Sequence, residues 1–203
     1  MKQTLLIIII TLSVLFCKAQ SPIIDIADKE TELVDGAYIK DVHNELDKFV
    51  GTWVYRHGNT SLTITFQKKV QVQSRYFRDL LIGEYQYIED GVEKINTLSI
   101  LQNQANLESP YEHNLVGSSI LLKYEFPGCP ECDPSEKRVK IEFTDPSPNM
   151  KHLNGIMFMG LRYINDNPEK LQISFGKIGT IIIEDGAPLE PNVPFGNYLL
   201  VKQ

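Results

Sequence analysis

The sequence predicts an all-β fold: an antiparallel meander barrel of about eight to ten strands, lipocalin- or calycin-like, with a β-sandwich as the alternative. From residue 50 onward apolar and polar residues alternate, as Leu62, Ile64 and Phe66 do around two threonines. This period of two is typical of strands with one buried face. Turn residues such as the Asp90-Gly91 pair separate the runs, and no helical repeat lies between them.

The first half of the chain predicts one short helix followed by strands. Residues 20–40 have no sustained period and predict an irregular lead-in. Apolar residues at 42, 46 and 49 predict a two-turn helix over residues 41–49. Strands are expected at 53–55 and 62–67, then at 77–88 with a return through 92–100. Lys68-Lys69 interrupts the alternation, which predicts a bulge or a strand end.

The second half repeats this pattern. Strands are predicted at 120–126, 139–143, 155–164, 170–175, 179–183 and 197–202. Met157 and Met159 share one apolar face of their strand, and Phe158 lies on the other. Such a strand is either central and covered on both faces, or it lines a ligand cavity. No linker or repeat divides residues 41–203, so we expect a single domain.

The N-terminus predicts export. Lys2 precedes an apolar run from Leu5 to Phe16, and Cys17-Lys18-Ala19 supplies small residues for cleavage before Gln20. We therefore expect residues 1–19 to be a signal peptide and the protein to reach the periplasm or the extracellular space. A retained anchor, or a lipoprotein acylated on Cys17, is the alternative. No membrane span is expected after cleavage, because the apolar run is too short.

The charge of the chain argues against two classes of partner. The formal net charge is −6, and it falls to −8 once Lys2 and Lys18 leave with the signal peptide. An acidic chain without a long basic run binds nucleic acid and anionic membranes poorly, because both carry negative charge. We expect a monomer that keeps a solvated, acidic surface.

Cys129 and Cys132 are the two cysteines that remain after cleavage, and we expect them to form a disulfide. Metal ligation and redox exchange are the alternatives. A structural zinc site needs four ligands, and the sequence has no second cysteine pair. The surrounding prolines and Gly128 favour a turn over the helix start that a redox pair uses.

The sequence predicts no catalytic residue, cofactor site or metal site. It lacks a nucleophile elbow and a phosphate loop, and its four histidines show no metal-ligand spacing. Glu84 lies either inward, as a general acid among tyrosines, or toward water, and we favour the second. His113 belongs to a polar loop that we expect to be solvated.

Residues 44–55, N-E-L-D-K-F-V-G-T-W-V-Y, resemble the opening of lipocalin-like (calycin) barrels. The resemblance implies that Gly51 and Trp53 start the first strand and that Trp53 packs across the closed end of the barrel. In that superfamily an arginine near the last strand stacks on the tryptophan. Lys202 and Arg162 are the candidates for this position here.

Over a longer span, F-V-G-T-W, N-T-S-L-T-I and D-L-L-I-G-E-Y-Q-Y-I-E-D-G-V-E-K are similar to a family of exported, uncharacterised proteins of Bacteroidota. This resemblance covers most of the mature chain. It supports export and the fold, and it implies no activity, substrate or catalytic residue.

Three functions remain open. The first is a non-catalytic binding protein that holds a small apolar ligand inside the barrel, lined by Phe66, Tyr85, Tyr87, Phe158 and Met159. The second is an extracellular module that binds another protein through loops 102–116, 145–154 and 185–196. The third is a hydrolase, which would need an acid–base pair or nucleophile in a cleft. We favour the first.

Overall fold

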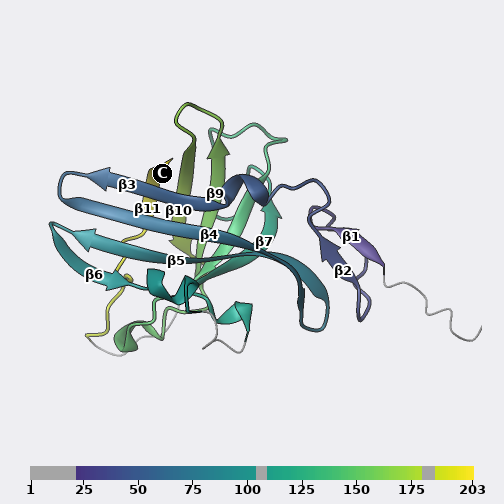
Figure 1. Cartoon of the computed structure of the whole chain (residues 1–203), viewed down its shortest axis with the longest axis horizontal. Helices are drawn as coiled ribbons and strands as arrows, with labels where there is room; N and C mark the ends of the chain where they lie inside the picture. Colours follow the sequence, from purple (N-terminus) through teal and green to yellow (C-terminus); the bar gives the residue numbers. More distant parts are fainter. Residues whose placement is uncertain (1–21, 104–108, 180–185) are drawn as a thin grey trace, which may run out of the picture.

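The computed structural model describes residues 22–103, 109–179 and 186–203, and it confirms the all-β prediction. Eight antiparallel strands form a closed barrel (Figure 1). Closure requires β11 to pair with β3 and β5 to pair with β7, and both ladders are present. The barrel strands are β3 (Gly51–His57), β4 (Thr60–Gln73), β5 (Phe77–Glu89), β7 (Leu115–Leu121), β8 (Arg138–Phe143), β9 (Met157–Ile164), β10 (Lys170–Lys177) and β11 (Gly196–Lys202).

The alternation of side chains sets the register of the barrel as predicted. Ile64 on β4 lies opposite Tyr85 on β5, and Phe66 lies opposite Gly83. The inward side chains of all eight strands belong to one continuous hydrophobic core. The β4–β5 register shifts between Lys69 and Val72, which confirms the bulge predicted near the lysine pair.

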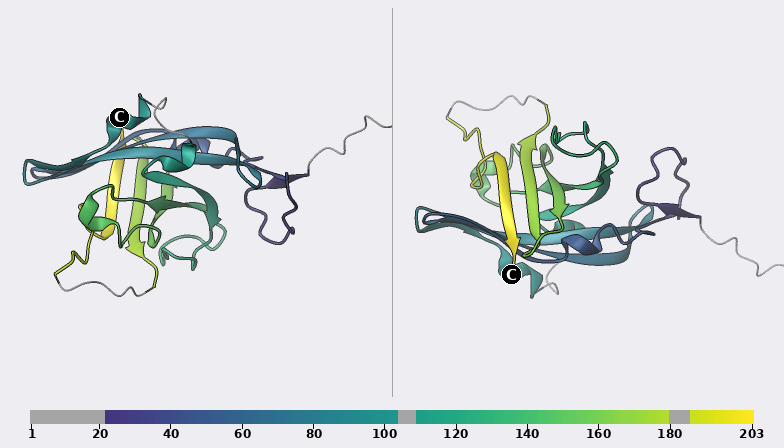
Figure 2. Two further views of the ribbon diagram at one scale, coloured as in Figure 1. Left: turned by 90° about the horizontal axis from the view of Figure 1, so that it is seen from below. Right: turned by 90° about the horizontal axis from the view of Figure 1, so that it is seen from above.

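The N-terminal lead-in is more regular than the sequence predicted. We call residues 22–40 the N-terminal ribbon; it contains β1 (Ile23–Asp25) and β2 (Tyr38–Lys40), which pair in parallel. β2 then pairs in parallel with β5, so the ribbon stands beside the barrel (Figure 2). Asp79 of β5 holds it there, accepting hydrogen bonds from the Tyr38 hydroxyl (2.7 Å) and the Asp41 backbone N–H (3.0 Å).

The predicted helix over residues 41–49 was wrong except for its last turn, the 3₁₀ helix η1 (Asp47–Phe49). The buried carboxylate of Asp41 accepts hydrogen bonds from the N–H groups of Glu45 (2.7 Å) and Leu46 (2.9 Å), which bends the chain. Asp side chains often compete with helical hydrogen bonds in this way. Leu46 and Phe49 are still buried, as their spacing predicted.

Two predicted strands have different bounds in the structure. The strand expected at 120–126 is β7, which begins at Leu115 and ends at Leu121; Tyr124 beyond it is exposed. The return strand expected at 92–100 is β6 (Val92–Asn96), followed by the 3₁₀ helix η2 (Leu98–Leu101). Two further 3₁₀ turns are η4 (Pro110–Glu112) and η5 (Pro148–Met150). The strand predicted at 179–183 lies almost wholly outside the described residues.

Gly117 provides a test of the β7 bulge, where the register against β8 shifts between Val116 and Ser119. A Cβ atom at Gly117 would lie 2.4 Å from the Lys140 carbonyl oxygen and 3.0 Å from the Ile141 Cα. We expect Gly117→Ala to lower the free energy of unfolding by about 1–3 kcal/mol in urea denaturation, because two backbones must separate. Gly128→Ala is the control, since no heavy atom lies within 4 Å of its Cβ position. An equal effect at both positions would contradict the bulge geometry.

Candidate functional site

Among the described residues, side chains of all eight strands pack together in the barrel interior. Phe66, Tyr85, Tyr87 and Met159, four of the predicted ligand-lining residues, are buried in the core cluster. The ring centroids of Tyr85 and Phe143 are 4.8 Å apart, and those of Phe143 and Phe175 are 4.5 Å apart. Rings at this separation are in direct contact. A ligand could enter this part of the lumen only by displacing them.

The fifth predicted residue, Phe158, does not share this space. It lies on the outer face of β9, opposite Glu142 of β8, while its neighbours Met157 and Met159 face the core. The inner face of β9 is therefore covered by the core, and Phe158 on its outer face borders a hollow on the barrel surface.

Trp53 lies at the end of the barrel where β3 begins. Its side chain is fully buried, and its indole N–H donates to the Phe49 carbonyl (2.8 Å). The Lys202 ammonium lies over the ring, 5.2 Å from its centroid. Of the two candidate cations, Lys202 is thus the one on the tryptophan; Arg162 pairs with Glu136 instead. Gly51 has φ +126°, a conformation that favours glycine.

The three predicted recognition loops meet at the opposite end of the barrel. The buried Asp145 carboxylate accepts hydrogen bonds from the N–H groups of Ser147 (3.0 Å) and Asn192 (2.8 Å), which joins two loops. The Asn114 carbonyl accepts from the Thr144 N–H (2.8 Å), which joins the third. Residues 104–108 and 185, which belong to these loops, lie outside the described residues.

Glu84 and His113 form a buried polar cluster that the sequence did not predict. Glu84 is fully buried, so the expectation that it points to water was wrong, as was that of a solvated His113. The Glu84 carboxylate contacts His113 Nδ1 (2.8 Å) and accepts from the Asn114 side-chain amide (2.6 Å). Only the fold reveals this contact, because 29 residues separate the acid from the histidine. These buried hydrogen bonds fasten the loop before β7, which carries His113 and Asn114, to Glu84 on the outside of β5.

An open groove lies on the outside of the barrel, where the edge of β5 changes partners. β5 pairs with β2 at Phe77 and Arg78, and with β7 only at residues 81–83. Because β7 pairs with β5 only through residues 115–117, it diverges from β5 beyond that point, and the N-terminal ribbon pairs with β5 there instead. The divergence leaves two adjoining hollows of about 520 and 400 Å³. Both volumes are within the range of small-molecule sites.

We call these two hollows together the outer groove. They share Arg78, Ser119 and Lys140. The first hollow is bounded mainly by Tyr76, Leu80, Tyr111, Ser118, Glu142 and Phe158. The second lies against the N-terminal ribbon and is bounded by apolar residues (Ile24, Ile26, Leu33, Ile39, Ile120 and Leu121) and by polar ones (Asp28, Lys29, Thr31 and Glu125). The groove thus has apolar walls on both sides of a polar centre.

Three donors at this centre have no hydrogen-bond or ion-pair partner among the described residues. Neither Arg78 nor Lys140 forms an ion pair with any described residue, and the Lys140 ammonium rests over the Phe158 ring, 3.9 Å from its centroid. Ser118 is only 2% exposed, and its hydroxyl makes no hydrogen bond within the described chain. A buried polar group without a partner is uncommon and calls for an explanation.

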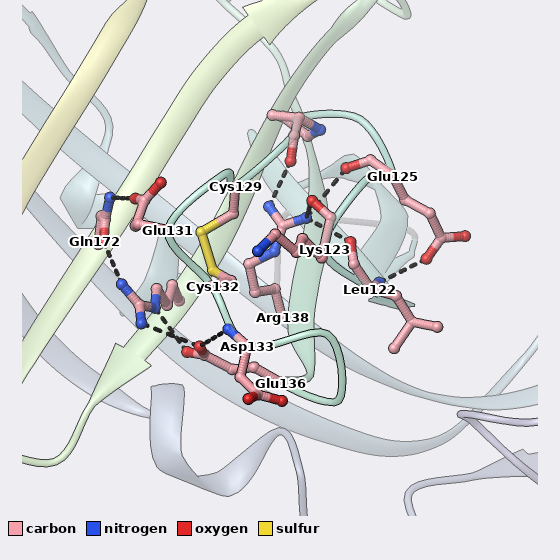
Figure 3. The surroundings of a disulfide bond; sticks show 12 residues. Leu122, Lys123, Glu125, Cys129, Glu131, Cys132, Asp133, Glu136, Arg138 and Gln172 are labelled. Carbon is pink, nitrogen blue, oxygen red and sulfur yellow. Dashed lines mark hydrogen bonds and ion pairs between the residues drawn. A yellow bond between two sulfur atoms is a disulfide. The ribbon is translucent and has the colours of Figure 1, made fainter.

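The predicted disulfide between Cys129 and Cys132 is confirmed, with a Cα–Cα distance of 5.4 Å. Figure 3 shows it beside Arg138, whose guanidinium reaches the loop after β7. Arg138 is buried and donates to the carbonyl groups of Leu122 (2.7 Å), Lys123 (3.3 Å), Glu125 (3.1 Å) and Pro127. These contacts explain why β7 stops at Leu121: the next carbonyls bind a side chain instead of a strand.

Within the described ranges, no group of three or more His, Cys, Asp or Glu side chains is placed to hold a metal ion. In the same ranges, no helix is long and apolar enough to cross a membrane.

The sequence profile of one family, described as a family of unknown function (DUF6705), matches residues 1–203, and the chain belongs to that family. No curated protein and no solved structure matches the chain. The predicted membership of a family without known function is therefore confirmed over the full length. Its Bacteroidota origin and its export stay predictions.

Arg138 tests how strongly the disulfide loop depends on one buried side chain. We expect Arg138→Met to lower the free energy of unfolding by about 3 kcal/mol, because several carbonyls lose a charged donor. The matched variant is Arg162→Met, whose half-buried pair with Glu136 predicts a loss of about 1 kcal/mol or less. Urea denaturation measures both, and equal losses would show that Arg138 does not organise the loop.

Proposed function

We propose that this member of the family is an exported, non-catalytic binding protein that holds its ligand in the outer groove. The observation that carries the proposal is the meeting of Arg78, Lys140 and the buried Ser118 hydroxyl in a hollow of about 520 Å³; none of the three has a hydrogen-bond or ion-pair partner in the described part of the chain. Binding sites typically combine apolar walls with a few convergent polar groups. The groove has both.

The geometry supports this groove over the barrel lumen that the sequence favoured. In the lumen, Tyr85, Phe143 and Phe175 already contact one another, and the Tyr85 hydroxyl donates to the Thr144 carbonyl (3.1 Å). Burial raises the pKa of Tyr85, so this hydroxyl stays protonated and keeps its bond. A small apolar ligand in the lumen would have to break these contacts, whereas the groove is open.

The second candidate is an extracellular module that binds a protein through loops 102–116, 145–154 and 185–196. Their meeting at one end of the barrel, joined through Asp145 and Asn192, favours it. Rigid frameworks commonly carry recognition loops in this way. The groove is the stronger candidate, because it offers unpaired donors, while the polar groups that join the loops bind each other.

We do not assign catalysis to the Glu84–His113 contact. An acid–base pair must reach substrate, and here the carboxylate is fully buried beneath the loop and saturated by His113 and Asn114. Its geometry suits fastening the loop.

Export predicts a defined mature N-terminus. When the gene is expressed in its own host, we expect cleavage after Ala19, because residues 1–19 have the order of a signal peptide. Intact-mass measurement of the protein outside the cytoplasm should match a chain beginning at Gln20. A chain still beginning at Met1, or one carrying lipid on Cys17, would contradict this part of the proposal.

Ser119→Trp tests the groove itself, since Ser119 is exposed and lines both hollows. Native mass spectrometry of protein purified from its own host should find a retained small molecule on the wild type and lose it in Ser119→Trp, because the indole fills the groove. Asn197→Trp is the control, adding the same bulk at an exposed position of β11. Equal retention by both variants, or no bound species in the wild type or in host extract, would refute the proposal.

A further inference from the structure

We infer that the outer groove selects a small organic anion: a compact acid group, such as a carboxylate, attached to an aromatic or apolar body. The inference rests on the proposed function and adds the chemical class of its ligand. It follows from the charges, the hydrogen-bond donors and the apolar walls of the groove.

The junction of the two hollows is cationic within an acidic protein. Arg78 and Lys140 line both hollows, whereas the net charge of the chain is −6. Two acids, Asp28 and Glu125, line the second hollow with Lys29; Glu125 pairs with Lys29, and Asp28 accepts N–H groups from its own turn. Glu142 borders the first hollow, and it forms no ion pair with Lys140. Since no described carboxylate pairs with Arg78 or Lys140, an anionic ligand would supply the partner that these two cations lack.

Lys140 is held in position before any ligand arrives. Its ammonium lies 3.9 Å from the centroid of the Phe158 ring, within the range of a cation–π contact. A side chain that is already ordered costs less entropy to recruit than a free lysine does. Phe158 thus acts as a positioning residue, and it also forms part of the apolar wall.

The Ser118 hydroxyl completes a set of donors. It is buried in the β7 bulge, lines the first hollow and has no hydrogen-bond partner in the described chain. A guanidinium fork, an ammonium and a hydroxyl match the acceptor oxygens of a carboxylate. A neutral ligand would leave the two cations unpaired.

Apolar walls flank this polar centre on both sides. Leu80 and Val116 line the first hollow, and Ile24, Ile39 and Leu121 line the second. A body attached to the acid group can thus lie along either wall while the acid group stays between Arg78 and Lys140. An inorganic anion would accept hydrogen bonds from the same donors but would leave the apolar walls exposed to water.

Two probes of the same shape, the anion 2-naphthoate and the neutral 2-naphthamide, distinguish the effect of charge on binding from the effect of shape. We expect the mature wild-type protein to bind the carboxylate at least about tenfold more tightly, since a charged hydrogen bond adds roughly that factor. Arg78→Gln should weaken 2-naphthoate about tenfold and leave 2-naphthamide unchanged in NMR titrations. Arg56→Gln is the control, because it removes an exposed cation from β3, outside the groove lining.

Ser118→Ala separates a binding role from a structural one. We expect weaker binding of 2-naphthoate together with an unchanged or higher unfolding midpoint, because the variant deletes a buried hydroxyl that has no partner. A residue that only supports the bulge would show a lower midpoint instead.

The outcomes distinguish the class of ligand from the site. Equal binding of both probes to the wild type, or no 2-naphthoate binding at millimolar concentration, overturns the inference, as does binding that Arg78→Gln leaves unchanged. If the wild type binds both probes equally and Ser119→Trp removes both, the groove remains the site and only the anionic class is refuted. If Ser119→Trp affects the binding of neither probe, the outer groove is not the binding site, and the proposed function is refuted as well.

Discussion

The short ladder between β5 and β7 determines both the closure of the barrel and the position of the outer groove. Three residue pairs, from Leu81–Gly117 to Gly83–Leu115, close the barrel. Without them the sheet would have two open edges, and the core would face water along the gap. With them, the side chains of all eight strands meet inside. Because the ladder is so short, the same two strands diverge beyond it, and the N-terminal ribbon and β7 become the walls of a groove.

Glycine and buried polar groups make this arrangement possible. Gly117 allows β7 to approach the backbone of β8, and Gly83 leaves room for the Phe66 ring across the β4–β5 ladder. Asp79, Glu84, Arg138 and Asp145 each hold a loop or the ribbon against the barrel. Each has hydrogen-bond partners, as buried charges need. The Ser118 hydroxyl and the Arg138 Nε are buried without a hydrogen-bond partner among the described residues. Of the two, Ser118 lines the outer groove, where we infer that a ligand supplies the missing bond.

The strands could be predicted from the sequence because alternation is a local signal. The inner face of β4 is predicted by the alternation of Leu62, Ile64 and Phe66 with polar residues. A disulfide loop is predicted by the short spacing of Cys129 and Cys132. The helix expected at 41–49 failed because Asp41 is occupied by backbone N–H groups and by Lys68, a contact 27 residues away. β2 could not be foreseen for a similar reason: three residues carry no period, and their partner is β5. The candidate site depends almost wholly on such distant contacts. Arg78, Ser118 and Lys140 come from three strands, and no local pattern joins them. Of the five ligand-lining residues predicted from the sequence, Phe158 is the one that reaches the groove.

We place the ligand outside the barrel, in the outer groove, and not among the core side chains. Methyl-resolved NMR of the mature protein titrated with 2-naphthoate tests it most directly, because the two spaces have different methyl groups. Met157 and Met159 face the lumen, whereas Ile24, Ile39 and Val116 border the groove. We expect the isoleucine and valine methyl signals to shift while the signals of Met157 and Met159 stay in place. Shifts of the methionine methyls without shifts at the groove would contradict it.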